Sequence, residues 1–244
     1  MTTRLDTHLV DIGHYATRAR AADAVRRGVV TVDGVTATKV GAKVAAGAVI
    51  AIDDPAAGYV SRGALKLIAG LDAFGFDPKG RQALDLGAST GGFTQVLLER
   101  GAAHVTAVDV GVGQMDPAVG GDPRVLRVEG VNARDLAADH LPAPLEAVVA
   151  DLSFISLRLA LPPALALAAP GAWLVALVKP QFEAGREALG KGGIVRDPAV
   201  HQRVCADVAG LLRQAGWVPT EPVVSPVTGG DGNTEFLIGA EKPA

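Results

Sequence analysis

Two kinds of hydrophobic pattern follow one another along the chain. Residues 4–27 place apolar side chains at helical spacing in two short stretches, and residues 29–52 carry short runs of β-branched residues. The turn Asp33-Gly34 within those runs predicts a β-hairpin of type I′, followed by a further strand at 48–52. From residue 61 onward, apolar runs alternate with longer helical stretches. This order predicts a small α+β unit followed by an α/β unit.

The apolar runs of the second part contain few polar residues, which is typical of buried parallel strands. We expect strands at 81–86, 104–109, 124–128, 147–151 and 173–178, with two last strands in 218–224 and 234–239. We expect helices at 17–27 with Thr17 as cap, at 62–74 with Ser61 as cap, at 93–100, and at 198–215 with Asp197 as cap. Strands that alternate with helices indicate an α/β fold with a Rossmann-like sheet.

A turn-rich segment separates the two parts. Asp53-Asp54-Pro55-Ala56-Ala57-Gly58 combines residues that favour turns over regular structure. The predicted domains are therefore residues 1–53 and 61–244, joined by a linker at 54–60. A chain of 244 residues is long enough for one full α/β domain and a small companion.

Composition excludes several classes of protein. Charged residues interrupt every apolar run in the first thirty positions, and no stretch of eighteen apolar residues exists, so we expect a cytoplasmic protein with no membrane contact. Cys205 is the only cysteine, which rules out an intrachain disulfide and a thiolate zinc site within one chain. The five histidines show no ligand spacing, and we expect no metal.

The net charge of −3 hides a basic segment. Residues 1–47 contain seven basic and four acidic side chains, and four of the arginines lie within positions 18–27. Such a cluster can be an ordinary solvated face or part of a module that binds another protein. The short helix pair, Gly28, the run VTVDG and the closing strand, however, resemble the S4 RNA-binding domain. In that fold the arginine-bearing face of the second helix lies against an RNA backbone, and arginine suits phosphate oxygens. The residues predicted to bind RNA are Arg4, Arg18, Arg20, Arg26, Arg27 and Arg62.

A glycine loop follows the first strand of the second part. Gly87, Gly91 and Gly92 allow a ligand to approach the backbone closely before the next helix, which indicates S-adenosylmethionine. NAD or a phosphate are alternatives, although the spacing is neither Gly-x-Gly-x-x-Gly nor that of a P-loop. Asp109 ends the next strand and can accept hydrogen bonds from ribose hydroxyls or simply form a turn, and Asn132 can contact adenine or likewise form a turn. The predicted cofactor-binding residues are Asp85, Gly87, Ser89, Gly91, Gly92, Phe93, Asp109, Asn132 and Phe154.

Four ionisable residues stand around this pattern in the order Lys66, Asp151, Lys179 and Glu235. Asp151 begins the run Asp-Leu-Ser-Phe, which lacks the two prolines with which many base-amino methyltransferases hold a planar base. The lysine pair instead favours an acceptor that must lose a proton. Each charge taken alone could be a surface ion pair.

With these residues, the chain resembles the hemolysin A (TlyA) family of ribosomal RNA 2′-O-methyltransferases, in which an S4 domain precedes an FtsJ-like catalytic domain. The motifs are VSRGALKL, DLGASTGGFT, NARDL, ADLSFISL, LVKPQFE, GGIVRDP and GNTEFL, in the family's order. The resemblance implies a catalytic tetrad of Lys66, Asp151, Lys179 and Glu235. It implies that Gly87, Gly91, Asp109 and Phe154 belong to the S-adenosylmethionine pocket and that ribosomal RNA or a ribosomal subunit is the partner.

The chain departs from the family pattern at two places, of which the second bears on the expected substrate. Tyr59 stands where the family often has tryptophan, and the chain ends soon after the Glu235 strand. The short end leads us to expect a cytidine of the large-subunit RNA as the target.

Within that reaction, we expect Lys179 to act as the base on the ribose hydroxyl and Asp151 to hold its amino group. Lys66 and Glu235 are expected to orient the ribose. Two alternatives remain, a non-catalytic RNA-binding assembly factor and a small-molecule O-methyltransferase. The second would not need the arginine-rich first domain.

Overall fold

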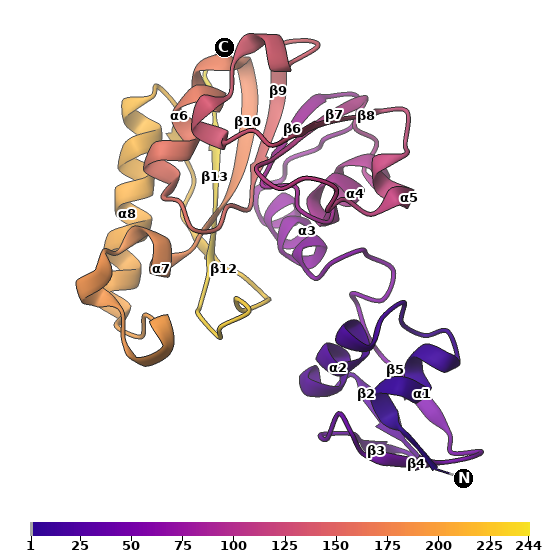
Figure 1. Cartoon of the computed structure of the whole chain (residues 1–244). Helices are drawn as coiled ribbons and strands as arrows, with labels where there is room; N and C mark the ends of the chain where they lie inside the picture. Colours follow the sequence, from indigo (N-terminus) through magenta and orange to yellow (C-terminus); the bar gives the residue numbers. More distant parts are fainter. Residues whose placement is uncertain (1) are drawn as a thin grey trace. The chain divides into compact units, whose positions relative to one another are not determined.

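The computed structural model describes residues 2–244 and divides between Gly58 and Tyr59 into two compact units (Figure 1). The division falls within the segment 54–60 that the sequence marks as a junction. The predicted domains at 1–53 and 61–244, with RNA binding in the first and catalysis in the second, stay a prediction.

The first unit is a small α+β fold. Its elements are β1 (Thr2–Arg4), α1 (Leu5–Asp11), α2 (Arg18–Arg27), β2 (Val30–Val32), β3 (Val35–Thr36), β4 (Lys43–Ala45) and β5 (Ile50–Ile52). The strands form an antiparallel sheet in the order β3-β2-β5 and a separate pair, β1 with β4. Leu5, Leu9 and Val25 of the two helices lie in one buried cluster with Val30 and Val44.

Local chemistry sets the ends of α2 and the hairpin as predicted. The Thr17 side chain accepts a hydrogen bond from the backbone N–H of Arg20, and Gly28 ends the helix in the left-handed conformation at φ 74°. Asp33 and Gly34 have φ values of 50° and 79°, as the two central residues of a type I′ turn require. Strands β1 and β4 were not predicted, because neither adjoins a recognisable hairpin turn and their pairing joins residues about 40 positions apart.

The second unit is a Rossmann-like α/β fold. Its strands are β6 (Gln82–Leu86), β7 (His104–Asp109), β8 (Val125–Glu129), β9 (Leu145–Ala150), β10 (Ala168–Val178), β11 (Val218–Pro219), β12 (Val223–Val224) and β13 (Phe236–Glu241). Its helices are α3 (Gly63–Phe74), α4 (Gly92–Glu99), α5 (Pro117–Gly120), α6 (Leu157–Leu167), α7 (Pro180–Glu183) and α8 (Pro198–Gln214). Four short 3-10 helices lie at Ala133–Asp135, Ala138–His140, Arg186–Ala188 and Lys191–Gly193.

The eight strands form one sheet in the order β11-β13-β10-β9-β6-β7-β8, with β12 also paired to β13. Strands β10, β9, β6, β7 and β8 are parallel, and β13 is antiparallel to β10. One face of the sheet packs on α3 and α4, and the other on α6 and α8 (Figure 1). The predicted fold class is therefore confirmed.

The register of the parallel strands aligns their carboxyl ends. Ala150 of β9 pairs with Leu86 of β6 on one side and with Ala176 of β10 on the other. The chain therefore leaves these three neighbouring strands at nearly the same level. This is the edge at which ligands bind in open α/β sheets.

One local prediction in the second unit was wrong, and one helix was not predicted. Ser61 does not cap α3, because the helix begins one residue later with Arg62 at the cap position and has no side-chain capping bond. Residues 157–167 form the helix α6 although Pro162 and Pro163 lie inside it. The prediction for Asp197 was correct, since its side chain accepts a hydrogen bond from the Ala199 N–H. Within residues 2–244 no helix is long and apolar enough to cross a membrane.

Candidate active site

The glycine loop packs against the strand that carries Asp151. Gly87 follows β6 at φ 82°, and a Cβ atom there would lie 2.5 Å from the backbone oxygen of Asp151. Gly91 precedes α4 at φ 95°, and Ser89 between them also has a positive φ of 46°. A side chain at position 87 would push the loop off β9, so the close approach requires glycine.

Asp109 fixes the start of this loop from the neighbouring strand. Its Oδ2 accepts a hydrogen bond of 2.8 Å from the Ser89 N–H, and its Oδ1 accepts one of 2.7 Å from the Gly111 N–H. Asp109 therefore forms a turn, which is one of the two roles predicted for it; the other is to accept hydrogen bonds from ribose hydroxyls. A carboxylate has about four lone-pair sites, so it can still accept two hydroxyl hydrogen bonds.

A cavity of about 480 Å³ lies above Asp109. Its walls include Gly87, Ser89, Asp109, Asn132 and Phe154, together with the apolar side chains of Val110, Val131, Leu152 and Ile155. The volume is within the range of small-molecule sites. The Asp109 carboxylate can accept hydrogen bonds from the two neighbouring ribose hydroxyls, and the apolar walls can contact a planar base. The cavity therefore fits the adenosine part of S-adenosylmethionine.

The remaining predicted cofactor residues have different surroundings. Asn132 lines this cavity, and its Oδ1 also caps a short helix through the Arg134 N–H at 3.2 Å. Gly92 and Phe93 line a second cavity. Asp85 and Gly91 line neither of these two cavities.

Asp85 is fully buried beneath the glycine loop. Burial raises its pKa to about 7, although a hydrogen bond of 2.6 Å from the Thr94 hydroxyl acts in the opposite direction. Thr94 is in the first turn of α4, and Asp85 is in β6, so this bond attaches the helix to the sheet. The observed contact supports a role in holding the loop, and direct cofactor binding by Asp85 stays a prediction.

The second cavity, of about 300 Å³, contains two buried lysines. Lys179 follows β10, and its Nζ lies 2.6 Å from Asp151 Oδ1 and donates a hydrogen bond of 2.8 Å to Ser153 Oγ. Lys66 of α3 donates a hydrogen bond of 2.6 Å to Glu235 Oε2, just before β13. Lys66, Asp151 and Lys179 line the cavity, and Glu235 holds Lys66. The structure thus brings all four residues of the predicted tetrad together.

The surroundings of the tetrad argue against ordinary surface ion pairs. The residues Lys66, Lys179 and Glu235 are 8%, 7% and 3% exposed. A buried charge without a partner costs several kcal/mol, and here each lysine has one carboxylate. The two cavities share Gly87, Ser89, Asp151 and Ser153, so the glycine loop and the loop after β9 separate a cofactor-sized space from the lysines.

A loop that no sequence motif indicated lies beside the second cavity. Val227, Thr228 and Gly230 line the cavity, and none of them belongs to a helix or strand. Asn233, which is completely buried, attaches this loop to another segment: its Oδ1 accepts from the Val195 N–H at 2.9 Å and its Nδ2 donates to the Gly193 oxygen at 3.2 Å. The only feature of the sequence that could have indicated this loop is Asn233 within the motif GNTEFL.

Within residues 2–244, no group of three or more histidine, cysteine, aspartate or glutamate side chains is arranged to hold a metal ion. The expectation of metal-independent chemistry stays a prediction.

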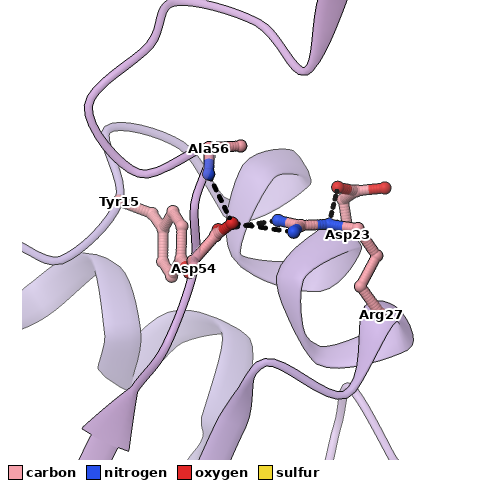
Figure 2. Close-up of polar contacts among 5 residues, drawn as sticks. All are labelled: Tyr15, Asp23, Arg27, Asp54 and Ala56. Atoms are coloured by element: carbon pink, nitrogen blue, oxygen red, sulfur yellow. Dashed lines mark hydrogen bonds and ion pairs between the residues drawn. The ribbon is translucent and has the colours of Figure 1, made fainter. Parts of the chain in front are cut away.

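In the first unit, Arg27 is held by carboxylates. Its guanidinium donates two hydrogen bonds of 2.7 Å to Asp54 and one of 2.9 Å to Asp23 (Figure 2). Asp54 also accepts from the Tyr15 hydroxyl and from the Ala56 N–H, both at 2.9 Å (Figure 2). Burial alone would raise the pKa of Asp54, but these hydrogen bonds outweigh it and hold the pKa below its usual value. The residue that the sequence placed in a linker is therefore bound into the first unit.

The other arginines of the predicted RNA surface differ in their contacts. Arg4 and Arg18 both form ion pairs with the buried Asp6, at 3.0 and 2.8 Å, and these two hydrogen bonds lower the pKa of Asp6 strongly. Arg26 is exposed on α2. Arg62 belongs to the second unit and lines the cavity of the two lysines. RNA binding by the six arginines stays a prediction, but three of the five N–H donors of Arg27 are already used within the protein.

Known proteins with similar sequences match both units. Residues 59–242 match the FtsJ-like methyltransferase family, and residues 3–50 match the S4 domain. The 16S/23S rRNA (cytidine-2′-O)-methyltransferase TlyA of Mycobacterium tuberculosis is 44% identical over 236 residues, which are 96% of this chain and 88% of the relative. The chain belongs to the TlyA group of the FtsJ-like methyltransferase family. The family resemblance indicated by the motifs is thus confirmed.

Two further comparisons agree with this assignment. The 23S rRNA (cytidine-2′-O)-methyltransferase TlyA of Campylobacter jejuni is 34% identical over 180 residues, 73% of this chain and 69% of the relative. A solved structure from Streptococcus thermophilus, whose name places it among hemolysins, covers 99% of this chain and 89% of its own, with 38% identity and a TM-score of 0.78. The FtsJ-like methyltransferase fold implies S-adenosylmethionine as the cofactor, in agreement with the volume and the lining of the 480 Å³ cavity.

Asp54→Ala is expected to lower the free energy of unfolding of the first unit by about 3 kcal/mol, because the half-buried Arg27 loses its two-pronged partner. Asp23→Ala removes only a more exposed bond to the same guanidinium and is expected to cost less than about 1 kcal/mol. Since the pKa of Asp54 is lowered by folding, its contribution is complete above about pH 4 and is lost as the pH falls through the folded pKa. Hydrogen exchange of peptides from residues 2–58 in the full chain measures both effects, and equal losses for the two variants would contradict the proposed difference.

Asp85→Asn is expected to change how stability depends on pH. The raised pKa of Asp85 means that the folded protein keeps a proton between about pH 4 and pH 7 that the unfolded chain has lost. Stability therefore falls as the pH rises through this range, by up to about 1.4 kcal/mol per pH unit, and this part disappears in the variant. The difference between the unfolding free energies of the two proteins should thus shift by roughly 2–3 kcal/mol in favour of the variant from about pH 5 to pH 7.5. A difference that stays constant would show that Asp85 is ionised in the folded protein.

Proposed function

We propose that this protein transfers the methyl group of S-adenosylmethionine to a ribose 2′-hydroxyl of ribosomal RNA. The observation that carries the proposal is the cavity in which Lys179 and Lys66 are both buried and each is paired with one carboxylate. This cavity shares a wall with a second space that fits an adenosine. A buried lysine beside a space for the acceptor suits a hydroxyl that must give up its proton.

Each side chain has a distinct part in the proposed reaction. When bound, S-adenosylmethionine supplies a methyl group on a positively charged sulfur. Asp109 and Asn132 would hold the adenosine part, beside Gly87 and Ser89 of the glycine loop. Lys179, as the neutral amine, accepts the proton of the 2′-hydroxyl, while Asp151 holds its nitrogen in place. Lys66, fixed by Glu235, donates a hydrogen bond that orients the ribose. General base catalysis contributes about 10²–10⁴-fold, and alignment supplies the rest.

The S4 domain favours RNA over a small acceptor. A small-molecule O-methyltransferase has no need for a separate unit with an arginine-bearing helix. The relatives named above act, according to their names, on cytidine in 16S and 23S rRNA or in 23S rRNA alone. We propose a cytidine of the large-subunit RNA as the target, and a ribosomal RNA substrate implies action in the cytoplasm. The second candidate, a non-catalytic assembly factor, would bind the cofactor and the RNA without methyl transfer.

The test is to treat ribosomal subunits with the protein and labelled S-adenosylmethionine, followed by nuclease digestion and mass spectrometry. We expect a 2′-O-methyl cytidine in the large-subunit RNA. Lys179→Ala is expected to lower the rate at least about 100-fold while S-adenosylmethionine affinity stays within a few-fold, because a base at the hydroxyl does not hold the cofactor. A label on a base ring would overturn the mechanism, and a methyl group only in the small subunit would overturn the choice of subunit. Cofactor and RNA binding without transfer by the wild type would favour the assembly factor.

Charge reversal at Arg26 should weaken RNA binding without altering cofactor affinity. Arg26 is exposed on α2, so Arg26→Glu disturbs no ion pair with the buried Asp6 or Asp54. The RNA affinity of the wild type should fall as the salt concentration rises, and the slope of the variant should be shallower, by about one released counterion per lost phosphate contact. Lys79→Glu makes the same change of charge in the second unit, before β6, and should leave the RNA affinity and the slope nearly unchanged. Equal affinities for both variants would show that α2 does not contact RNA.

A further inference from the structure

Ser153 is the second partner of the Lys179 amino group. Lys179 Nζ donates a hydrogen bond of 2.8 Å to Ser153 Oγ, and Asp151 Oδ1 lies 2.6 Å from the same nitrogen. Ser153 also lines both the 300 Å³ and the 480 Å³ cavity. It therefore stands at the boundary between the space proposed for the cofactor and the space proposed for the acceptor.

The geometry of a tetrahedral nitrogen gives this contact a consequence. A lysine nitrogen has three positions besides its bond to Cε, and one hydrogen bond is enough to set the directions of all three. Ser153 Oγ accepts that hydrogen bond, whereas Asp151 Oδ1 pairs with the nitrogen by charge and accepts no hydrogen bond. We propose that Ser153 is a positioning residue for Lys179: the hydrogen bond to its hydroxyl fixes the rotation of the amino group about the Cε–Nζ bond, so that the lone pair of the neutral amine faces the acceptor hydroxyl in the cavity. This inference rests on the proposed function and adds to it the direction in which the base acts.

A hydroxyl suits this role better than a second carboxylate. A carboxylate beside an amine favours its charged form in general, and that form has no lone pair and cannot accept a proton. A second carboxylate would strengthen that preference. A serine oxygen accepts a hydrogen bond from either form of the amine and carries no net charge. It therefore fixes the direction of the nitrogen with little effect on its charge.

The segment that follows Ser153 is held against the segment that follows Lys179. Phe154, the next residue, has a φ of 65°, which non-glycine residues seldom adopt, and its ring lies 5.2 Å from that of Phe182. Further along, Glu183 accepts hydrogen bonds from the Ser156 hydroxyl at 2.6 Å and from the Leu157 N–H at 2.8 Å. Phe182 and Glu183 belong to α7, which directly follows Lys179. The loop that carries Ser153 and the segment that carries Lys179 are thus fastened to each other at several points.

Ser153→Ala is expected to lower kcat by about 10- to 100-fold, the size expected for the loss of a hydrogen bond to an ionisable group. The KM for ribosomal subunits and the Kd for S-adenosylmethionine should stay within about threefold, because the serine is proposed to aim the base and not to bind either ligand. Ser153→Thr keeps the hydroxyl and should restore kcat to within about fivefold of the wild type. An increase in the cofactor Kd that accounts for the whole loss of activity would make Ser153 a cofactor contact and overturn the proposal.

Ser156→Ala is the matched control in the same loop. Its hydroxyl donates to Glu183 and accepts from the Arg158 N–H, so the variant should lose stability at the start of α6. It should nevertheless keep kcat within about threefold, since its hydroxyl does not contact Lys179. If Ser156→Ala and Ser153→Ala lose kcat equally, the loss reflects the loop as a whole, and the specific role of Ser153 is refuted.

A second measurement does not depend on turnover. Acetylation of Lys179 by a soluble amine-reactive ester, followed by peptide mass spectrometry, reports how firmly its nitrogen is held. Ser153→Ala should speed acetylation at Lys179 several-fold over the wild type, and Ser153→Thr and Ser156→Ala should not. If the wild type transfers no methyl group, the proposed function fails. The acetylation rates then still decide whether Ser153 holds the Lys179 nitrogen. Faster acetylation in Ser153→Ala would support it, and equal rates would overturn it.

Discussion

The burial of two lysines at one edge of the sheet is the constraint on which the second unit depends. Neither Lys66 nor Lys179 can be buried as a cation unless a carboxylate lies beside it. Glu235, the partner of Lys66, is 169 residues away along the chain, and only the antiparallel addition of β13 beside β10 brings it within 2.6 Å. Asp151 reaches Lys179 because β9 and β10 are adjacent and end at the same level. The strand order is therefore what allows both charges to be buried.

The two units use the same kind of contact for different purposes. In the first unit Arg27 is paired with Asp54, and an arginine stays charged at any pH at which the protein is folded. Such a pair can only fix the chain, and here it fixes the residues that precede the division between the units. In the second unit the cations are lysines, which can lose a proton when burial and neighbouring positive charge disfavour the ammonium. Because replacement of a buried ion pair by apolar residues is often neutral or stabilising, the lysine pairs are better explained by reactivity than by stability.

The sequence predicted what depends on local pattern and missed what depends on distant partners. Apolar runs gave the parallel strands, and Thr17 and Asp197 gave the starts of α2 and α8, because a capping side chain bonds to a backbone N–H two or three residues ahead. The contacts of Arg27 could not be predicted, since its partner Asp54 lies in a segment that resembles a linker. Ser153 was overlooked for the same reason: a serine after a strand has no distinctive pattern, and only the register of β9 and β10 places it beside Lys179.

One backbone contact determines how the cofactor space and the acceptor space meet. Gly87 lies so close to the Asp151 oxygen that no side chain fits between them, and both residues line both cavities. The glycine loop is in turn held by Asp109 from the next strand, and Asp85 below it holds α4. The position of the group that holds the base is therefore set by the loop that holds the cofactor. Methyl transfer needs the attacking oxygen to lie in line with the methyl carbon and the sulfur, to within a few tenths of an ångström. A direct backbone contact between the two loops provides that accuracy without depending on flexible side chains.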